Sequence, residues 1–180
     1  MQFTLKNYLS EYTVETPIGK LRISVLKDKI NNISFVEDST NSNDFSTLLP
    51  IMKKAIRQLE EYFNGERKNF DLVLNLSRGT EFQSSVWKAA IKIPYGEVRT
   101  YAQIARDIGN PLAYRAVANA LASNPFVIVV PCHRVVSKKG IGGFSAGVWR
   151  KKWLLSLENM EEDVHDNKTF RRAQAYKRRS

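Results

Sequence analysis

Residues 79–125 are divided into helix-length segments by a regular series of start and stop signals. Thr80 and Thr100 are each followed three residues later by a glutamine, which is the pattern of a helix N-terminal capping box. Pro94 and Pro125 stop two of the segments, and Gly109 stands where a left-handed residue ends the other. The signals predict three helices, over about residues 80–93, 100–108 and 112–122. A short glycine-containing turn between the last two is typical of a helix-turn-helix, although many helical hairpins share it.

The predicted third helix has an outward face made almost entirely of small residues. At about 100° per residue, Arg115 shares one side of the helix with Ala118, Asn119 and Ala122. Side chains this small allow a helix to lie close to another surface, and DNA is one candidate. The alternative is packing against the first part of the chain, which would make Arg115 an ordinary surface arginine.

The first part of the chain has the pattern of a small α/β unit. Its predicted elements are, in order, strands over residues 8–14, 21–26 and 30–36, a helix over 48–63 and a strand over 70–76. A turn at residues 16–19 joins the first two strands, and a polar loop at 38–46 precedes the helix. Ser77-Arg78-Gly79 is the predicted linker to the second part.

Positive charge gathers in the second part of the chain. The whole chain has a formal net charge of +10, and residues 79–160 carry 11 Lys/Arg against 4 Asp/Glu, a net charge of +7. A basic balance confined to one segment indicates a polyanionic partner, and nucleic acid before membrane. The alternative is a solvated basic surface that serves solubility.

Apolar runs and cysteine content exclude several classes of protein. The longest apolar run, residues 126–130, is far too short to span a membrane, and the first residues lack a secretory pattern. We therefore expect a cytoplasmic protein, or a nuclear one if the source is eukaryotic. Cys132 is the single cysteine, which excludes an internal disulfide and a thiolate-rich zinc site.

Cys132 is followed directly by His133 and Arg134. A thiol is a nucleophile only as the thiolate, and a nearby base or positive charge favours that form. Adjacent side chains on an extended backbone diverge, so a bridging water or a bend in the chain would have to connect His133 with the sulfur. The alternative is a small buried cysteine without reactivity.

The chain around Cys132 resembles one known family. Pro131-Cys132-His133-Arg134-Val135 is similar to the active-site motif of the O6-alkylguanine-DNA alkyltransferases. Further matches follow the family's order and spacing over about 80 residues. They are Gly79-Thr80-Glu81-Phe82-Gln83, Val86-Trp87-Lys88-Ala89, Ile93-Pro94-Tyr95-Gly96-Glu97-Val98, Tyr101, Gly109-Asn110-Pro111, Arg115-Ala116-Val117, Asn124-Pro125, Trp153-Leu154-Leu155 and Glu158.

The resemblance implies DNA repair by direct reversal. An alkyl group, chiefly methyl, would pass once and irreversibly from O6 of guanine in duplex DNA to Cys132, with O4 of thymine as a further candidate. The target base would be flipped out of the stack. His133 would act as a base through a water, oriented by Glu158, so that the thiol ionises. Asn124 would tie the helix-turn-helix to the Cys132 segment.

The resemblance also implies contacts to DNA and to the base. Arg115 would enter the duplex and fill the space of the flipped base, and Tyr101 would favour rotation of the nucleotide and contact the guanine. The backbone carbonyls of Cys132 and Val135 would accept from the exocyclic amine, and the Ser145 amide would donate to O6. Further DNA contacts would come from Ala116, Ala118 and Asn119. No cofactor and no metal are implied, because the lesion is itself the alkyl donor.

The expected fold class is α/β + α. A small N-terminal α/β domain of RNase H-like type would cover residues 1–77, and a winged-helix-like helix-turn-helix domain with the site would cover 78–160. Residues 161–180 would be a basic, disordered tail. We expect a monomer that binds double-stranded DNA containing O6-alkylguanine, with no membrane and no obligate protein partner.

Several positions depart from the family or have a simpler explanation. Tyr114 precedes Arg115 where the family commonly keeps a small residue, and it would either pack beside Leu121 or widen the DNA contact. Phe144 and Ala146 stand in the loop that shapes the alkyl pocket. Taken without the family, Tyr101 is explained equally well by core packing. The predicted inward residues of a last helix over 149–158 are Trp153, Leu154 and Leu157.

Three other functions remain as alternatives. A non-enzymatic lesion-binding relative would lack Cys132. A helix-turn-helix regulator would need more base-reading side chains on its recognition helix than Arg115 and Asn119. A cysteine hydrolase would need a water-accessible second step.

Overall fold

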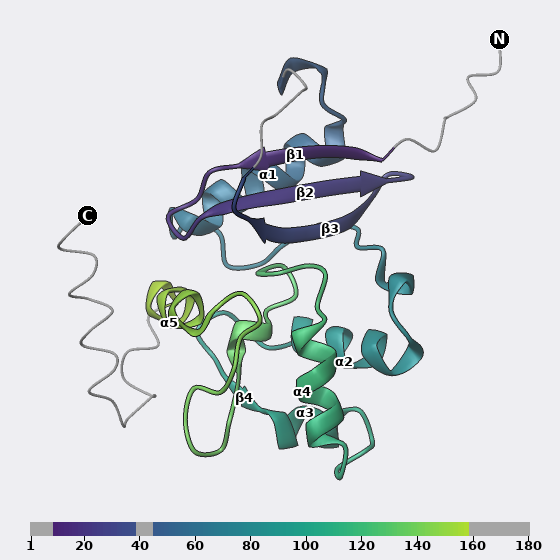
Figure 1. Ribbon diagram of the computed structural model, residues 1–180, viewed down its shortest axis with the longest axis vertical. Helices are drawn as coiled ribbons and strands as arrows, with labels where there is room; N and C mark the ends of the chain where they lie inside the picture. The colour runs from purple at the N-terminus through teal and green to yellow at the C-terminus, as the bar shows by residue number, and fades with distance from the viewer. Residues whose placement is uncertain (1–8, 39–44, 159–180) are drawn as a thin grey trace. The chain divides into compact units, whose positions relative to one another are not determined.

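The chain folds into two compact units, Met1–Arg78 and Gly79–Ser180 (Figure 1). The computed structural model describes residues 9–38 and 45–158, so the predicted tail over 161–180 lies outside the described residues. Both units have the mixed helices and strands that the sequence predicts. No helix among the described residues is long and apolar enough to cross a bilayer.

The first unit contains a three-stranded antiparallel sheet in the order β1-β2-β3. The strands are β1 (Ser10–Val14), β2 (Lys20–Leu26) and β3 (Lys29–Val36). β2 and β3 are joined by Lys27 and Asp28, whose φ angles of 49° and 55° make the two-residue hairpin turn with both residues left-handed. α1 (Pro50–Phe63) packs against β2 and β3 with a buried side that includes Met52 and Leu59. These elements confirm the three predicted strands and the helix.

The strand predicted over residues 70–76 is wrong. Only Leu74 forms a bridge, a parallel one to Ile30, flanked by hydrogen bonds from Ile30 N to Val73 O (2.8 Å) and from Asn75 N to Ile30 O (2.8 Å). Earlier in the segment, the side chain of Gln58 accepts from Asp71 N (2.9 Å) and donates to Asp71 O (3.3 Å). A side chain thus takes the place of a neighbouring strand, so the alternating apolar pattern persists without a continuous ladder.

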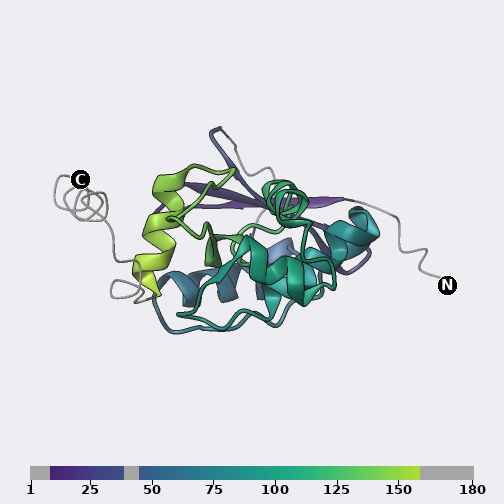
Figure 2. The same ribbon diagram turned by 90° about the horizontal axis from the view of Figure 1, so that it is seen from below.

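The second unit is built on three short helices, α2 (Glu81–Ile91), α3 (Tyr101–Asp107) and α4 (Tyr114–Ala122). Both predicted capping boxes are present, with Thr80 and Thr100 each exchanging hydrogen bonds with the glutamine three residues later. α3 and α4 lie side by side in both views (Figures 1 and 2). Trp87 of α2 is buried and donates from its indole nitrogen to Ala120 O of α4 at 2.8 Å. The predicted helix-turn-helix is therefore confirmed as an element of the fold.

The turn between α3 and α4 has the geometry that the sequence predicts. Gly109 has a φ of 76°, and its N–H donates to Arg106 O at 2.9 Å. Asn110 N–H donates to Ala105 O at 2.9 Å. This pair of bonds is the Schellman arrangement, which satisfies the last carbonyls of α3 and turns the chain toward α4.

The chain after α4 returns to the helix-turn-helix through a small parallel sheet. β4 (Arg99–Thr100) pairs with β5 (Val135–Val136), directly after a single 3-10 turn, η3 (Cys132–Arg134). The apolar run before it folds into tight, buried turns in which Ile128 has a φ of 74°. This pairing brings the Cys132 turn to the start of α3.

The last helix, α5 (Val148–Leu157), buries a different face from the one predicted. Leu154 is inside as expected, but its buried neighbours are Leu155 and Lys151, while Trp153 and Leu157 are only half-buried. The prediction chose the inward face from apolar residues alone. Lys151 takes an inward position because its ammonium group donates to two backbone carbonyls.

Replacing Gly109 by Ala should destabilise the protein by about 1–2 kcal/mol, because an L side chain is strained at this left-handed φ. No atom lies within 4 Å of the added Cβ, so the effect should come from the backbone alone. Gly140→Ala is the matched control, since that position is also open and lacks a positive φ. Urea denaturation should show a lower free energy of unfolding for Gly109→Ala and not for Gly140→Ala. Equal free energies for the two variants would contradict the turn assignment.

Candidate active site

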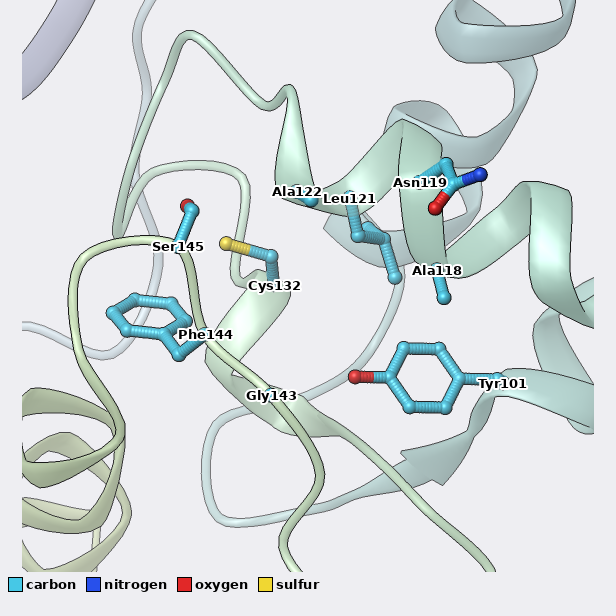
Figure 3. Close-up of a pocket in the computed structure, with 9 residues that line it drawn as sticks. All are labelled: Tyr101, Ala118, Asn119, Leu121, Ala122, Cys132, Gly143, Phe144 and Ser145. Atoms are coloured by element: carbon cyan, nitrogen blue, oxygen red, sulfur yellow. The ribbon is translucent and has the colours of Figure 1, made fainter.

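A cavity of about 300 Å³ opens beside Cys132 in the second unit (Figure 3). Figure 3 shows Cys132 between Phe144 and Ser145 on one side and residues of α4 on the other. The lining residues are Tyr101, Ala118, Asn119, Leu121, Ala122, Cys132, Gly143, Phe144 and Ser145. Residues from α3, α4, η3 and the segment before α5 therefore share one pocket.

Cys132 lies in the tight turn η3, with 6% of its surface exposed. Its sulfur accepts a hydrogen bond from Asn124 Nδ2 at 3.1 Å. The same amide nitrogen donates to Val130 O at 3.0 Å, and Asn124 Oδ1 accepts from Phe126 N at 2.9 Å. Asn124 thus connects the end of the helix-turn-helix to the Cys132 turn.

The thiol of Cys132 is held in its neutral form at rest. Burial raises the pKa of Cys132, and this outweighs the opposite effects of the Asn124 hydrogen bond and the Lys151 charge. The sequence predicts ionisation from the neighbouring His133 and Arg134, but both of these side chains bind Glu158. Desolvation therefore opposes the charged sulfur in the resting pocket, and the ionisation that the resemblance assigns to His133 remains a prediction.

Glu158 is a buried carboxylate that receives four hydrogen bonds. Its Oε1 accepts from His133 Nε2 (2.9 Å) and Arg134 Nη2 (2.9 Å), and its Oε2 accepts from Arg134 Nε (2.8 Å) and Gly96 N (3.2 Å). Burial pushes the pKa of Glu158 upward, but the bonds and charges of His133 and Arg134 outweigh it and lower the pKa to about 2. The carboxylate is ionised at neutral pH.

His133 is fully buried and neutral. Burial lowers its pKa, and this exceeds the raising effect of Glu158. An ionised carboxylate only accepts, so Nε2 carries the proton of the ring and Nδ1 carries the lone pair. The structure thus brings Cys132, His133, Glu158 and Asn124 into one cluster, as the resemblance implies.

Tyr101 faces the pocket and is not a core residue. It lies half-buried at the start of α3, and Figure 3 shows its hydroxyl directed toward the Cys132 side of the cavity. Burial raises the pKa of Tyr101, so the hydroxyl remains a hydrogen-bond donor. A Cβ added at Gly142 would lie 3.0 Å from this hydroxyl, so the glycine allows the close approach.

The other predicted contact residues divide between α4 and the pocket wall. On α4, Arg115, Ala116 and Asn119 are exposed and Ala118 is half-buried. Tyr114 does not pack into the core, since it is 46% exposed, and the Arg115 guanidinium lies 5.8 Å from its ring centre.

Two further predicted contacts stand near the sulfur. Ser145 is exposed on the pocket wall, whereas Val135 is fully buried. The Val135 carbonyl already accepts from Lys151 Nζ at 2.6 Å. No group of three or more His, Cys, Asp or Glu side chains in residues 9–38 and 45–158 is arranged to hold a metal ion.

Comparisons with known proteins agree with this geometry. Residues 9–76 match the ribonuclease-like domain of 6-O-methylguanine DNA methyltransferase, and residues 81–160 match its DNA binding domain. The chain belongs to the 6-O-methylguanine DNA methyltransferase family. It is 44% identical over 153 residues to a methylated-DNA–protein-cysteine methyltransferase of Methanosarcina acetivorans, a match that covers 80% of this chain and 94% of the relative.

A protein and a solved structure from Mycobacterium tuberculosis are also similar to this chain. The protein, a methylated-DNA–protein-cysteine methyltransferase, is 44% identical over 149 residues, covering 81% of this chain and 90% of the relative. The crystal structure of the Mycobacterium tuberculosis OGT in complex with DNA aligns with a TM-score of 0.73 and 42% identity, covering 83% of this chain and 92% of that one.

Sequence reasoning missed one buried residue of this methyltransferase-family site. Lys151 donates from Nζ to Val135 O (2.6 Å) and Gly143 O (3.0 Å) and lies 6.0 Å from the ring centre of Tyr101. Burial lowers its pKa to about 8, and a thiolate at Cys132 would act in the opposite direction. Its spacing from Leu154, Leu155 and Glu158 places it on their face of α5, and this signal could have found it.

Replacing Glu158 by Gln should make the free energy of unfolding depend less on pH below 4.5. The folded pKa of about 2 lies below the ordinary 4.5, so the carboxylate contributes fully above pH 4.5 and loses its contribution as pH falls toward 2. The contribution is about 3 kcal/mol at neutral pH. Urea denaturation between pH 2 and 7 should show this fall in the free energy of unfolding with falling pH in the wild type and not in the variant.

The control for that measurement is Glu97→Gln, which makes the same change at an exposed site in the turn next to Gly96. It should keep the wild-type slope. A Glu158→Gln variant with an unchanged slope would contradict the assignment of Glu158 as the buried anion.

Proposed function

We propose that this protein repairs DNA by transferring an alkyl group from O6 of guanine to the sulfur of Cys132. The observation that carries the proposal is the position of the single cysteine on the wall of a pocket that α4 also lines. Asn124 donates to its sulfur, and His133 of the same turn is hydrogen-bonded to the buried Glu158 at the end of α5. Membership of the methyltransferase family and the cysteine acceptor named in its relatives support the same reaction.

Duplex DNA is the proposed partner. The exposed face of α4 that contains Arg115 is otherwise made of small residues. The DNA complex of the Mycobacterium tuberculosis relative supports DNA binding, and the match of residues 81–160 to a DNA binding domain supports binding through this unit. We infer that α4 lies in the minor groove and that affinity depends strongly on salt. Because the pocket lies beside α4, the damaged base must leave the stack to reach Cys132, and Arg115 is suited to fill the gap.

Ionisation of the thiol follows substrate binding in this proposal. A neutral thiol with only 6% of its residue surface exposed is protected from other electrophiles until the alkylated base arrives. His133 Nδ1 then accepts the thiol proton through one water, and the Glu158 carboxylate stabilises the imidazolium that forms. Asn124 Nδ2 remains as a donor to the thiolate.

The transfer itself is a displacement at the alkyl carbon. The thiolate forms the new C–S bond as the C–O6 bond breaks, and guanine leaves and takes up one proton. We infer that Tyr101 donates it or hydrogen-bonds the departing base, and that the Ser145 amide donates to O6; both residues line the pocket. The carbonyls of Cys132 and Val135 would accept from the exocyclic amine. A thioether has no easy route back to a thiol, so each molecule acts once and needs no cofactor.

Further features of the proposal concern the fold and the assembly. The small β4–β5 sheet beside the helix-turn-helix supports a winged-helix-like second domain, and the ribonuclease-like description of the matching family supports an RNase H-like first domain. We infer that a monomer is active, because one second unit already contains Cys132 and a complete lining around it.

Incubation with a duplex that contains O6-[³H]methylguanine should place one label per protein on Cys132. Cys132→Ser should acquire none while still binding the duplex, because a neutral hydroxyl is a far weaker nucleophile than a thiolate. Peptide mapping and filter binding measure the two results. Binding without transfer by the wild type would indicate a lesion-binding protein, and release of labelled methanol would indicate a hydrolase; either result excludes the proposed reaction.

Loss of the Asn124 hydrogen bond should raise the pKa of the Cys132 thiol. Asn124→Ala removes a bond of about 1.4 kcal/mol, so the pH midpoint of iodoacetamide alkylation should rise by about one unit. Asn124→Asp keeps the acceptor for Phe126 N and adds a negative charge, so it should raise the midpoint further.

Asn119→Ala is the control for this titration, because Asn119 also lines the pocket but belongs to the exposed face of α4. Its midpoint should equal that of the wild type. If all four proteins titrate alike, Asn124 has no influence on the sulfur.

A further inference from the structure

The wall of the pocket opposite α4 is a short segment in which every residue except Phe144 is small. It runs from Gly143 to Gly147 and contributes Gly143, Phe144 and Ser145 to the lining (Figure 3). Both end residues are glycines, and Ser145 and Ala146 are also small, so the backbone has much conformational freedom to lose. One bond lies within the segment, from Gly147 N to Phe144 O at 2.9 Å, and a single bond stabilises it only modestly.

Two successive cations from the first turns of α5 bind this segment near its two ends. Arg150 Nη1 donates to Ala146 O at 2.6 Å, and Lys151 Nζ donates to Gly143 O at 3.0 Å. Lys151 also donates to Val135 O, directly after the turn that contains Cys132. The two bonds thus attach the wall to the helix and, through Lys151, to the strand that follows the nucleophile.

The Arg150 bond is supported by an aromatic ring. Trp149 is 51% exposed, and the Arg150 guanidinium lies 4.5 Å from its ring centre. Stacking on a planar ring restricts the guanidinium and reduces the entropy lost when it binds Ala146 O. A Cβ at Gly147 would approach the same ring within 3.3 Å, so the glycine also leaves room for it.

We propose that Arg150 is a positioning residue that, together with Lys151, holds the pocket wall by both ends and so sets which alkyl groups the pocket accepts. This inference rests on the proposed function of the pocket. A wall held at Gly143 and Ala146 keeps Ser145 and Phe144 at a fixed distance from the sulfur. Release of the Ala146 end lets this wall move outward, which harms the placement of a small alkyl group more than that of a large one.

The test compares transfer rates for two alkyl groups. Duplexes with O6-methylguanine or O6-benzylguanine are incubated with the wild type and Arg150→Ala, and the second-order rate constants are measured. Arg150→Ala should slow methyl transfer by about tenfold, as loss of a charged hydrogen bond predicts, and slow benzyl transfer much less. The benzyl-to-methyl ratio should therefore rise several-fold.

Two further variants distinguish the attachment of the wall by Arg150 and Lys151, called the clamp below, from a general effect of lost positive charge. Lys152→Ala removes the next cation on α5, which makes no hydrogen bond or ion pair among the described residues, and it should leave the ratio unchanged. Arg150→Lys keeps the charge without the planar guanidinium and should resemble Arg150→Ala more than the wild type. An unchanged ratio in Arg150→Ala, or an equal change in Lys152→Ala, overturns the proposal.

Hydrogen exchange distinguishes failure of the clamp from failure of the proposed function. The amide of Gly147 should exchange faster in Arg150→Ala than in the wild type or Lys152→Ala, whatever the chemistry of the pocket. If the wild type transfers neither alkyl group, the proposed function is wrong. The exchange rates alone then show whether Arg150 holds the pocket wall. If exchange is unchanged while transfer to the wild type is normal, only the clamp is wrong.

Discussion

The buried carboxylate of Glu158 is the interaction on which the rest of the second unit depends. It binds the side chains of His133 and Arg134, which follow the nucleophile, and the backbone of Gly96 in the turn before β4. Arg134 also donates to Ile93 O, two residues after the end of α2. A buried anion is stable only when donors surround it, so the end of α5, the Cys132 turn and the turn between α2 and β4 must come together for this charge to be buried.

This arrangement explains why the nucleophile is neutral at rest. The positive charge beside Cys132 in the sequence is used to neutralise Glu158, and burial then favours the uncharged thiol. The same packing makes His133 a neutral base with a fixed tautomer. In the proposed single-turnover reaction, a thiol that ionises only in the presence of its substrate would avoid loss of the molecule to unrelated electrophiles.

Local signals were sufficient for much of the fold. The capping residues at Thr80 and Thr100 and the left-handed Gly109 predict helix boundaries correctly because each acts within a few residues of chain. The strand predicted over 70–76 failed because strand pairing depends on a partner, and there the side chain of Gln58 takes the hydrogen bonds. Lys151 was missed because apolar character alone does not predict a lysine whose ammonium group finds buried carbonyls.

By itself, the sequence determined the helix-turn-helix, the single possible sulfur nucleophile and the family to which the chain is similar. These depend on residue identity and short spacing, which are properties of the chain before it folds. Only the tertiary structure decided the protonation of Cys132, the pocket-facing position of Tyr101 and the attachment of the pocket wall by Arg150 and Lys151. Each of these depends on desolvation and on contacts between segments far apart in the chain, and neither can be read from neighbours in sequence.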